Sequence, residues 1–238
     1  MELDTVDASL HHPFGMVIAA SSGAGKTMFC KCLLKNLDNL VDKPIHSIHY
    51  HYACWQPLYE EMQRGSLGDH IVFRNDLPHP EEELCSASGQ IYNQENRLYV
   101  IDDRQRELSE RKAYLDQLFS RTIHHCNCSV ILLLQDLYYK NIRCATINSN
   151  YVVLLQNKSN ELACRTLCAQ TYCGPERSRL FWSAYNKCMT KPYGYLLVDR
   201  HPGTDERIRL RTDIFPNSNG DNSTPDGHMR CFADPSTL

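Results

Sequence analysis

The chain has 238 residues, 42% of them hydrophobic and 22% charged, with a formal net charge of -3. This composition is ordinary for a folded protein that buries a sizeable core, and the length favours one large domain. The near-neutral charge excludes a strong overall positive field, so any contact with nucleic acid must come from local patches or from a ring of subunits.

The sequence carries no sign of a membrane or secretory segment. It has no run of about 18 consecutive apolar residues. Its first residues include Glu2, Asp4 and Asp7, where a signal peptide carries basic residues followed by an apolar run. We therefore expect an intracellular protein with no membrane partner.

The twelve cysteines are then expected to be reduced thiols. They form no CxxC pair, and most are best interpreted as small buried hydrophobic groups. The best metal candidate is the cluster His124, His125, Cys126 and Cys128, but it lacks the two-sided spacing of a closed zinc site.

Strands and helices alternate along the first part of the chain. A short apolar run ends in small residues, after which apolar residues recur at helical spacing, the pattern of a strand, a glycine loop and a helix. The predicted elements are a strand at Phe14–Ala20, a helix at Lys26–Leu37, a strand at Ile45–His51, a helix at Trp55–Met62 and a strand at Ile71–Arg74.

The alternation continues in the second part. Ser129–Leu134 is the most continuous apolar run, as expected of a central strand in a parallel sheet covered on both faces. Glu107–Arg121 has apolar residues at helical spacing with charges between them, which predicts one amphipathic helix. The remaining predicted elements are strands at Leu98–Ile101, Tyr151–Leu155, Tyr195–Val198 and Arg207–Ile214, and helices at Leu162–Cys173 and Arg179–Met189.

This order predicts an α/β fold with a mostly parallel central sheet flanked by helices and with ligands at the carboxyl edges of the strands. From Asn217 onward the composition turns to Asn, Ser, Gly, Asp and Pro, which predicts a disordered tail. The predicted organisation is an N-terminal extension at 1–11, one domain at 12–216 and the tail at 217–238.

The glycine loop matches the phosphate-binding pattern GxxxxGK[ST], except that Ala20 replaces the first glycine. Backbone N–H groups at the helix N-terminus would cradle the phosphates of ATP, Lys26 would bridge the β- and γ-phosphates, and the Thr27 hydroxyl would bind Mg²⁺. An ordinary Gly/Ser turn is the alternative. The predicted nucleotide-binding residues are Ser21, Ser22, Gly23, Ala24, Gly25, Lys26 and Thr27.

Two carboxylates close the strand Leu98–Ile101. Asp102 would hold Mg²⁺ through its water shell, since this ion keeps several waters and takes few protein carboxylates. Asp103 is placed to orient or deprotonate the attacking water. A strand that ends in two solvated acids is the bland alternative, and the upstream phosphate loop favours the catalytic interpretation.

Three further residues are catalytic candidates. Gln135 directly follows the strand Ser129–Leu134, where a polar side chain can point at the γ-phosphate and sense hydrolysis. An arginine from a neighbouring subunit would stabilise the charge of the transition state. Arg121 and Arg143 are the candidates for this role, with surface solvation as the alternative for both.

Several segments resemble the DNA-packaging ATPases of poxvirus type, and most closely those of Maverick/Polinton and adintovirus-like elements. The similarity spans residues 12 to 216 in order. It rests on His12-Pro13-Phe14, Ile48–Tyr59 (IHYHYACWQPLY), Ile101-Asp102-Asp103, Leu118–Gln135 (LFSRTIHHCNCSVILLLQ), Asn148–Tyr151 (NSNY), Leu155-Gln156-Asn157 and Arg209–Pro216 (RLRTDIFP).

The resemblance implies a P-loop NTPase of the ASCE, RecA-like type in the FtsK/HerA group. It further implies a homo-oligomeric ring that threads double-stranded DNA into a capsid at a portal-like vertex, in the host nucleus or at a cytoplasmic assembly site. Two departures stand out: Ala20-Ser21-Ser22 replaces the family's common Gly-Pro-Thr, and Cys126 stands where many members have Arg. The second departure makes Arg121 the preferred trans arginine.

Two rival functions remain open, a nucleotide or small-molecule kinase and an NTP-binding switch without turnover, because both also use such loops. The two carboxylates favour water as the phosphoryl acceptor. DNA contact is predicted at the basic stretches Arg104–Lys112 and Arg207–Arg211, although such runs are often solvated faces.

Overall fold

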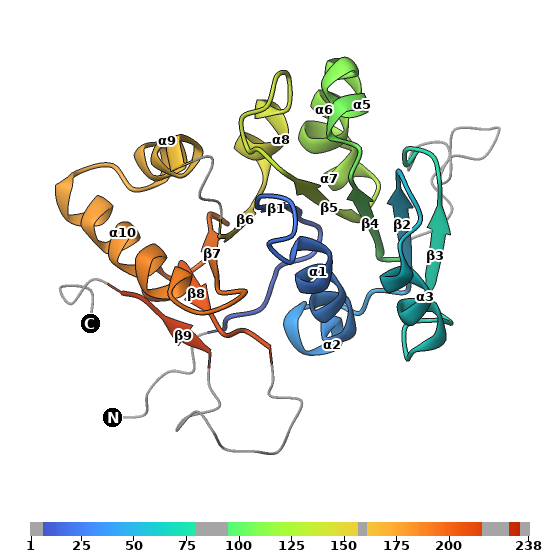
Figure 1. Cartoon of the computed structure of the whole chain (residues 1–238), viewed down its shortest axis with the longest axis horizontal. Helices are drawn as coiled ribbons and strands as arrows, with labels where there is room; N and C mark the ends of the chain where they lie inside the picture. Colours follow the sequence, from blue (N-terminus) through green and yellow to red (C-terminus); the bar gives the residue numbers. More distant parts are fainter. Residues whose placement is uncertain (1–6, 80–94, 157–160, 216–228, 234–238) are drawn as a thin grey trace.

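The computed structural model describes residues 7–79, 95–156, 161–215 and 229–233. Within these ranges one nine-stranded sheet has the order β3-β2-β4-β5-β1-β6-β7-β8-β9 (Figure 1). The strands are β1 (Gly15–Ala19), β2 (Ser47–Tyr52), β3 (Ile71–Arg74), β4 (Arg97–Asp102), β5 (Cys128–Leu134), β6 (Tyr151–Leu155), β7 (Tyr195–Asp199), β8 (Leu210–Thr212) and β9 (Arg230–Cys231).

The six strands from β3 to β6 in this order are parallel, and β7, β8 and β9 add antiparallel pairs at the β6 side. The predicted α/β fold with a mostly parallel central sheet is therefore confirmed. Central strands such as β1 and β5 are buried along their whole length because helices cover both faces of the sheet.

Each face of the sheet has its own hydrophobic core, because successive side chains of a strand point to opposite faces. Met16 and Ile18 face one core, and Val17 and Ala19 face the other. The first face is covered by α1 (Lys26–Lys35), α2 (Leu37–Leu40) and α3 (Pro57–Arg64). The second face is covered by α5 (Gln105–Glu110), α6 (Lys112–Gln117), the π-helix η1 (Leu118–Thr122), α7 (Ile123–His125), α8 (Arg143–Asn148), α9 (Glu161–Thr171) and α10 (Pro175–Met189).

The single helix expected at Glu107–Arg121 is wrong. The chain instead makes two short helices that meet at Arg111, which departs from helical geometry at ψ 54, and then a π-helical turn. A π-turn holds one extra residue per turn. This widening lets Leu118, Phe119 and Ile123 all bury against the sheet.

Part of the expected disordered tail is also wrong, since Arg230–Cys231 forms β9 and pairs with β8. Phe232 N donates to Leu210 O at 2.9 Å, so the segment satisfies backbone groups at the edge of the sheet. Backbone pairing of this kind does not depend on apolar side chains, which is why a polar composition did not reveal it. Residues 216–228 and 234–238 lie outside the described ranges.

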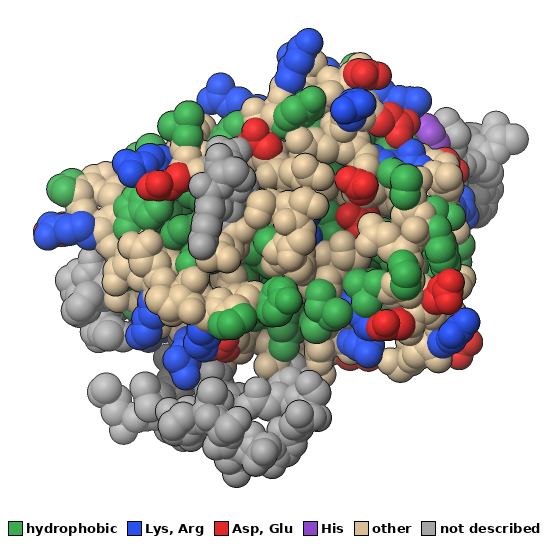
Figure 2. Space-filling model, in the orientation of Figure 1, with side chains coloured by type: hydrophobic (Ala, Val, Ile, Leu, Met, Phe, Trp, Pro, Cys, Tyr) green, Lys and Arg blue, Asp and Glu red, His purple; other side chains and the backbone are tan. Residues whose placement is uncertain are grey.

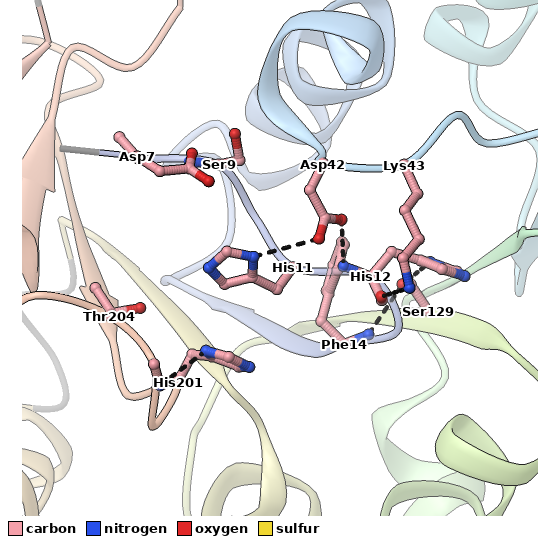
Figure 3. Close-up of polar contacts among 12 residues, drawn as sticks. Asp7, Ser9, His11, His12, Phe14, Asp42, Lys43, Ser129, His201 and Thr204 are labelled. Carbon is pink, nitrogen blue, oxygen red and sulfur yellow. Dashed lines mark hydrogen bonds and ion pairs between the residues drawn. The ribbon is translucent and has the colours of Figure 1, made fainter. Parts of the chain in front are cut away.

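The segment before β1 is fastened to the amino edge of the sheet by buried polar contacts (Figure 3). The His12 ring lies 2.7 Å from Ser129 Oγ through Nδ1 and 3.1 Å from Asn127 O through Nε2. Asp42 accepts a hydrogen bond from His12 N at 2.8 Å and lies 3.3 Å from His11 Nδ1. Burial lowers the pKa of His12. The histidine of the His-Pro-Phe segment therefore has a structural role away from the strands' carboxyl edge.

Residues 7–11, the described part of the predicted N-terminal extension, pack on the domain that follows. Leu10 is buried and forms a parallel β-bridge with Val41. None of the helices in the described ranges is long and apolar enough to cross a bilayer.

Candidate active site

The strand order brings the predicted catalytic segments to one edge of the sheet. β4, β5 and β1 are adjacent and parallel, so their carboxyl ends meet there. The loop after β1, the acids that end β4 and the glutamine after β5 converge on a cavity of about 310 Å³. Its lining includes Lys26, Thr27, Asp102, Asp103 and Gln135.

The phosphate loop is built on two glycines with left-handed backbone. Gly23 has φ 76 and Gly25 has φ 95, a region that other residues rarely adopt. Gly25 is also the N-cap of α1 and has no side chain to cap the first N–H groups of the helix. These donors and the positive end of the helix dipole are thus left for an anion. Ala20, in place of the usual first glycine, is buried, directly follows β1 and is not among the residues with positive φ.

Lys26 curls back over the loop that it follows. Its Nζ donates to Ala20 O at 2.8 Å and to Ser21 O at 3.1 Å. Burial lowers the pKa of Lys26, and the nearby charges of Asp102 and Asp103 oppose that shift. An ammonium group has three donors, so one remains for a ligand in the cavity.

Asp102 is the most constrained group of the site, with 3% of its surface exposed. Its Oδ2 atom accepts hydrogen bonds from Tyr50 OH at 2.7 Å, Tyr59 OH at 3.0 Å and Thr27 Oγ1 at 3.2 Å. Burial raises the pKa of Asp102, the three hydrogen bonds lower it, and Asp103 raises it further. The two predicted metal ligands, Thr27 and Asp102, are therefore in direct contact.

The two tyrosines are site residues that the sequence did not reveal. Tyr50 lies on β2 and Tyr59 on α3, both fully buried, with ring centroids 5.1 Å apart. Both packing partners of Asp102 come from the Ile48–Tyr59 segment that marks the family resemblance. The sheet brings them together: on β2, next to β4, Tyr50 pairs in register with Val100, two residues before Asp102, and the sequence alone does not show this pairing.

Asp103 differs from its neighbour in exposure and backbone. Its side chain is exposed and its φ is 57, the left-handed region that Asp tolerates better than most residues. This turn at the end of β4 presents Asp103 to the cavity. The adjacent acids thus combine one buried carboxylate with one that water can reach.

Gln135 is held at the cavity by another residue that sequence reasoning missed. Gln105 Oε1 accepts hydrogen bonds from Gln135 N at 2.7 Å and from Asp136 N at 3.2 Å. Gln105 is the first residue of α5 and also lines the cavity. It therefore ties the end of β5 to the segment that leaves Asp103.

The structure does not bring Arg121 to the cavity of its own chain. Arg121 is exposed in η1, and the helical run from α5 to α7 leads from the carboxyl end of β4 back to the amino end of β5. Arg121 is therefore not a residue of the cavity of its own chain. Arg143 is also exposed, but it begins α8 in the connection that follows the carboxyl end of β5.

Most of the two basic stretches predicted for DNA contact is neutralised locally. Arg104 is buried and donates to Tyr52 O and Glu107. The salt bridges of the second stretch are Arg207–Asp205 at 2.7 Å, Arg209–Glu206 at 2.6 Å and the buried pair Arg211–Asp199.

Arg111 is exposed but pairs with Glu107 at 3.3 Å. Arg106 and Lys112, which are also exposed, remain as candidates for phosphate contact in the first stretch. On the face in Figure 2, the basic and acidic side chains of the described residues are interspersed. Among these residues, this face therefore carries no broad basic surface for DNA.

Two other features lack the chemistry of this cavity. Within the described ranges, no group of three or more His, Cys, Asp or Glu side chains is placed to hold a metal ion, the His124–Cys128 segment included. A larger hollow of about 580 Å³ is lined by residues of α9 and α10. Its charged residues Glu161 and Arg165 are paired with each other at 2.7 Å.

Comparisons with known proteins support the fold. No protein-family model matches the chain, and no curated protein matches it. The chain is similar to the cytoplasmic domain of the Type VII secretion ATPase EccC from Thermomonospora curvata, with 14% identity, a TM-score of 0.52 and coverage of 94% of this chain and 28% of that one. It thus spans less than a third of that structure.

A second solved structure matches over most of both chains. The genome packaging NTPase B204 from Sulfolobus turreted icosahedral virus 2, in complex with sulfate, is 17% identical with a TM-score of 0.49, over 81% of this chain and 94% of that one. The topology, the glycine loop and the likeness to EccC together show that the chain has the P-loop NTPase fold, α/β with a mostly parallel sheet flanked by helices.

Proposed function

We propose that the chain is an ATPase whose hydrolysis of ATP drives double-stranded DNA into a capsid. The observation that carries the ATPase proposal is the contact of 3.2 Å between Thr27 Oγ1 and Asp102 Oδ2, in the same cavity as Lys26. A phosphate-loop hydroxyl and a strand-end carboxylate at this distance can share one Mg²⁺ ion. The loop N–H groups and Lys26 would bind the phosphates.

The residues present fit Mg²⁺. The Thr27 hydroxyl donates its proton to Asp102, so its lone pairs remain for a metal ion. Among the described residues, the three donors to Asp102 all bind Oδ2. Its Oδ1 can therefore accept a hydrogen bond from metal-bound water. When bound, the ion would neutralise charge on the β- and γ-phosphates.

Asp103 and Gln135 are assigned to the attacking water. Asp102 is buried and its Oδ2 already accepts three hydrogen bonds, so it is screened from the attacking water. Asp103 is exposed to the cavity and can orient the water or take its proton. Gln135, whose backbone N–H donates to Gln105, would respond to the γ-phosphate.

The motor function is supported by the sequence resemblance to poxvirus-type packaging ATPases, and among them to those of Maverick/Polinton and adintovirus-like elements. We propose a homo-oligomeric ring acting inside the host cell at a portal-like vertex. In such a ring the arginine that stabilises the transition state comes from the neighbour. Arg121 remains the proposed residue, and Arg143 the alternative.

The deciding experiment is ATP hydrolysis by the full chain with and without duplex DNA. Hydrolysis that increases with DNA, and that is lost in Lys26→Ala under both conditions, supports the motor. The double variant Arg106→Ala/Lys112→Ala should lose DNA stimulation and keep its basal rate, with Arg165→Ala on α9 as the matched surface control. Phosphoryl transfer to a metabolite would instead indicate a kinase, and binding without turnover a switch.

A further inference from the structure

An exposed tyrosine stands beside the phosphate loop on the side away from the catalytic acids. Tyr193 lies in the turn between α10 and β7 and has 74% of its surface exposed. β7 runs antiparallel to β6, with Tyr195 opposite Leu155, so the turn before β7 reaches the edge where the parallel strands end. A Cβ atom built on Gly25 would lie 3.0 Å from Tyr193 Cδ1.

The turn that carries Tyr193 is fixed by a hydrogen bond, an ion pair and close backbone packing. Gly194 N donates to Lys191 O at 3.1 Å, and Lys191 Nζ pairs with Asp213 Oδ2 at 3.1 Å. A Cβ atom at Gly194 would fall 1.9 Å from Cys188 O, so the backbone packs too closely there for a side chain. Tyr193 itself has φ 57, which is unfavourable for an aromatic residue. The fold therefore holds this ring at the loop despite a local cost.

The direction of a bound nucleotide follows from the strand order. In the sequence β4-β5-β1-β6-β7, the groups assigned to the metal and the attacking water lie on the β4 and β5 side of the phosphate loop. A nucleotide with its terminal phosphate on that side extends its base toward β6 and β7. Tyr193 is the large exposed aromatic side chain at this position among the described residues.

We propose that the Tyr193 ring stacks on the purine base of the bound nucleotide and so acts as the base-binding residue of the site. This inference rests on the proposed function, since it requires a nucleotide in the phosphate loop. Stacking on a ring face depends on the size of the base and not on its hydrogen-bonding groups. The site should therefore prefer purine over pyrimidine triphosphates and discriminate weakly between ATP and GTP.

The test separates the base from the phosphates by using inorganic tripolyphosphate, which has no base. Calorimetric titration gives the dissociation constants of Mg-ATP and Mg-tripolyphosphate for the full chain and its variants. Tyr193→Ala should weaken ATP binding about 5- to 150-fold, while Tyr193→Phe, which keeps the ring, stays near the parent value. Tripolyphosphate binding should be the same in all three proteins.

Two controls guard against a purely structural effect. Tyr193→Asn removes the ring but tolerates the left-handed backbone, so it should behave as Tyr193→Ala does. Leu162→Ala removes a side chain that is 72% exposed on α9 and should change neither ligand.

Unchanged ATP affinity in Tyr193→Ala, or equal weakening of ATP and tripolyphosphate, overturns the assignment of Tyr193. Failure of the parent protein to bind either ligand overturns the proposed function and this inference with it.

Discussion

The hydroxyl groups of Tyr50 and Tyr59 are predicted to set the ionisation and position of Asp102. Tyr50→Phe and Tyr59→Phe each remove one of the three donors to Asp102 Oδ2 and leave the buried rings in place. These hydrogen bonds lower the pKa of a carboxylate that burial raises. Each variant should therefore raise the pKa of Asp102 further and loosen its hold on metal-bound water.

The geometry sets the expected size and order of the effect. Partners that orient metal-binding groups contribute about 10- to 100-fold to metal affinity or activity. We expect a loss in this range in kcat/KM for Mg-ATP, larger for Tyr50, whose contact is 2.7 Å, than for Tyr59 at 3.0 Å. The double variant leaves Thr27 as the remaining donor and should lose more than either single variant.

The assay is steady-state ATP hydrolysis over a Mg²⁺ titration and across pH. Asp102 must be ionised for activity, so activity falls as pH decreases through its pKa, and the variants should show this fall at higher pH. The matched control is Tyr151→Phe, which removes a buried hydroxyl that bonds His11 N at 2.9 Å at the opposite edge of the sheet. Parental Mg²⁺ and pH dependence in the double variant would refute the reasoning.

Three shorter predictions test the rest of the site. Lys26→Ala should abolish turnover while circular dichroism and thermal unfolding show an intact fold; an active variant would remove the proposed site. Asp103→Asn should bind ATP with near-parental affinity and lose hydrolysis in single-turnover assays, and undiminished turnover assigns the base elsewhere. Asp102→Asn should lose turnover but gain stability at neutral pH. Since burial raises the pKa of Asp102 in the folded state, its contribution to stability is present at low pH and lost as pH rises through that pKa. The advantage in melting temperature should therefore shrink toward acid, and a pH-independent difference contradicts the assignment.

The sheet could be predicted from the sequence because its strands are buried on both faces. Runs such as Cys128–Leu134 and Tyr151–Leu155 carry almost no polar residue, and this pattern is typical of strands in a parallel sheet that is covered on both faces. The features that were missed are decided by long-range contacts. The π-turn at Leu118–Thr122 depends on how the helix packs on the sheet. β9 forms because β8, about 20 residues earlier in the chain, offers a free edge.

The candidate site divides in the same way. Residues next to a motif, from Ser21 to Thr27 and from Asp102 to Asp103, could be placed because a strand end or a helix start fixes them locally. Tyr50, Tyr59 and Gln105 approach their partners across 52, 43 and 30 residues of sequence. A single sequence gives no local pattern for such pairs, so only the folded sheet reveals them.

The contrast between the two adjacent acids shows how the fold assigns different tasks to one residue type. Asp102 is the last residue of β4, so its side chain points into the core beside Tyr50, Tyr59 and Thr27, where three donors fix its oxygen. One residue later the backbone turns left-handed, and Asp103 faces the cavity with its side chain exposed. A fixed and desolvated carboxylate suits the holding of a metal ion's water shell, and an exposed, hydrated one suits proton transfer. The register of Tyr52 with Asp102 makes Asp102 the last paired residue of β4, so Asp102 takes the buried position and Asp103 the turn.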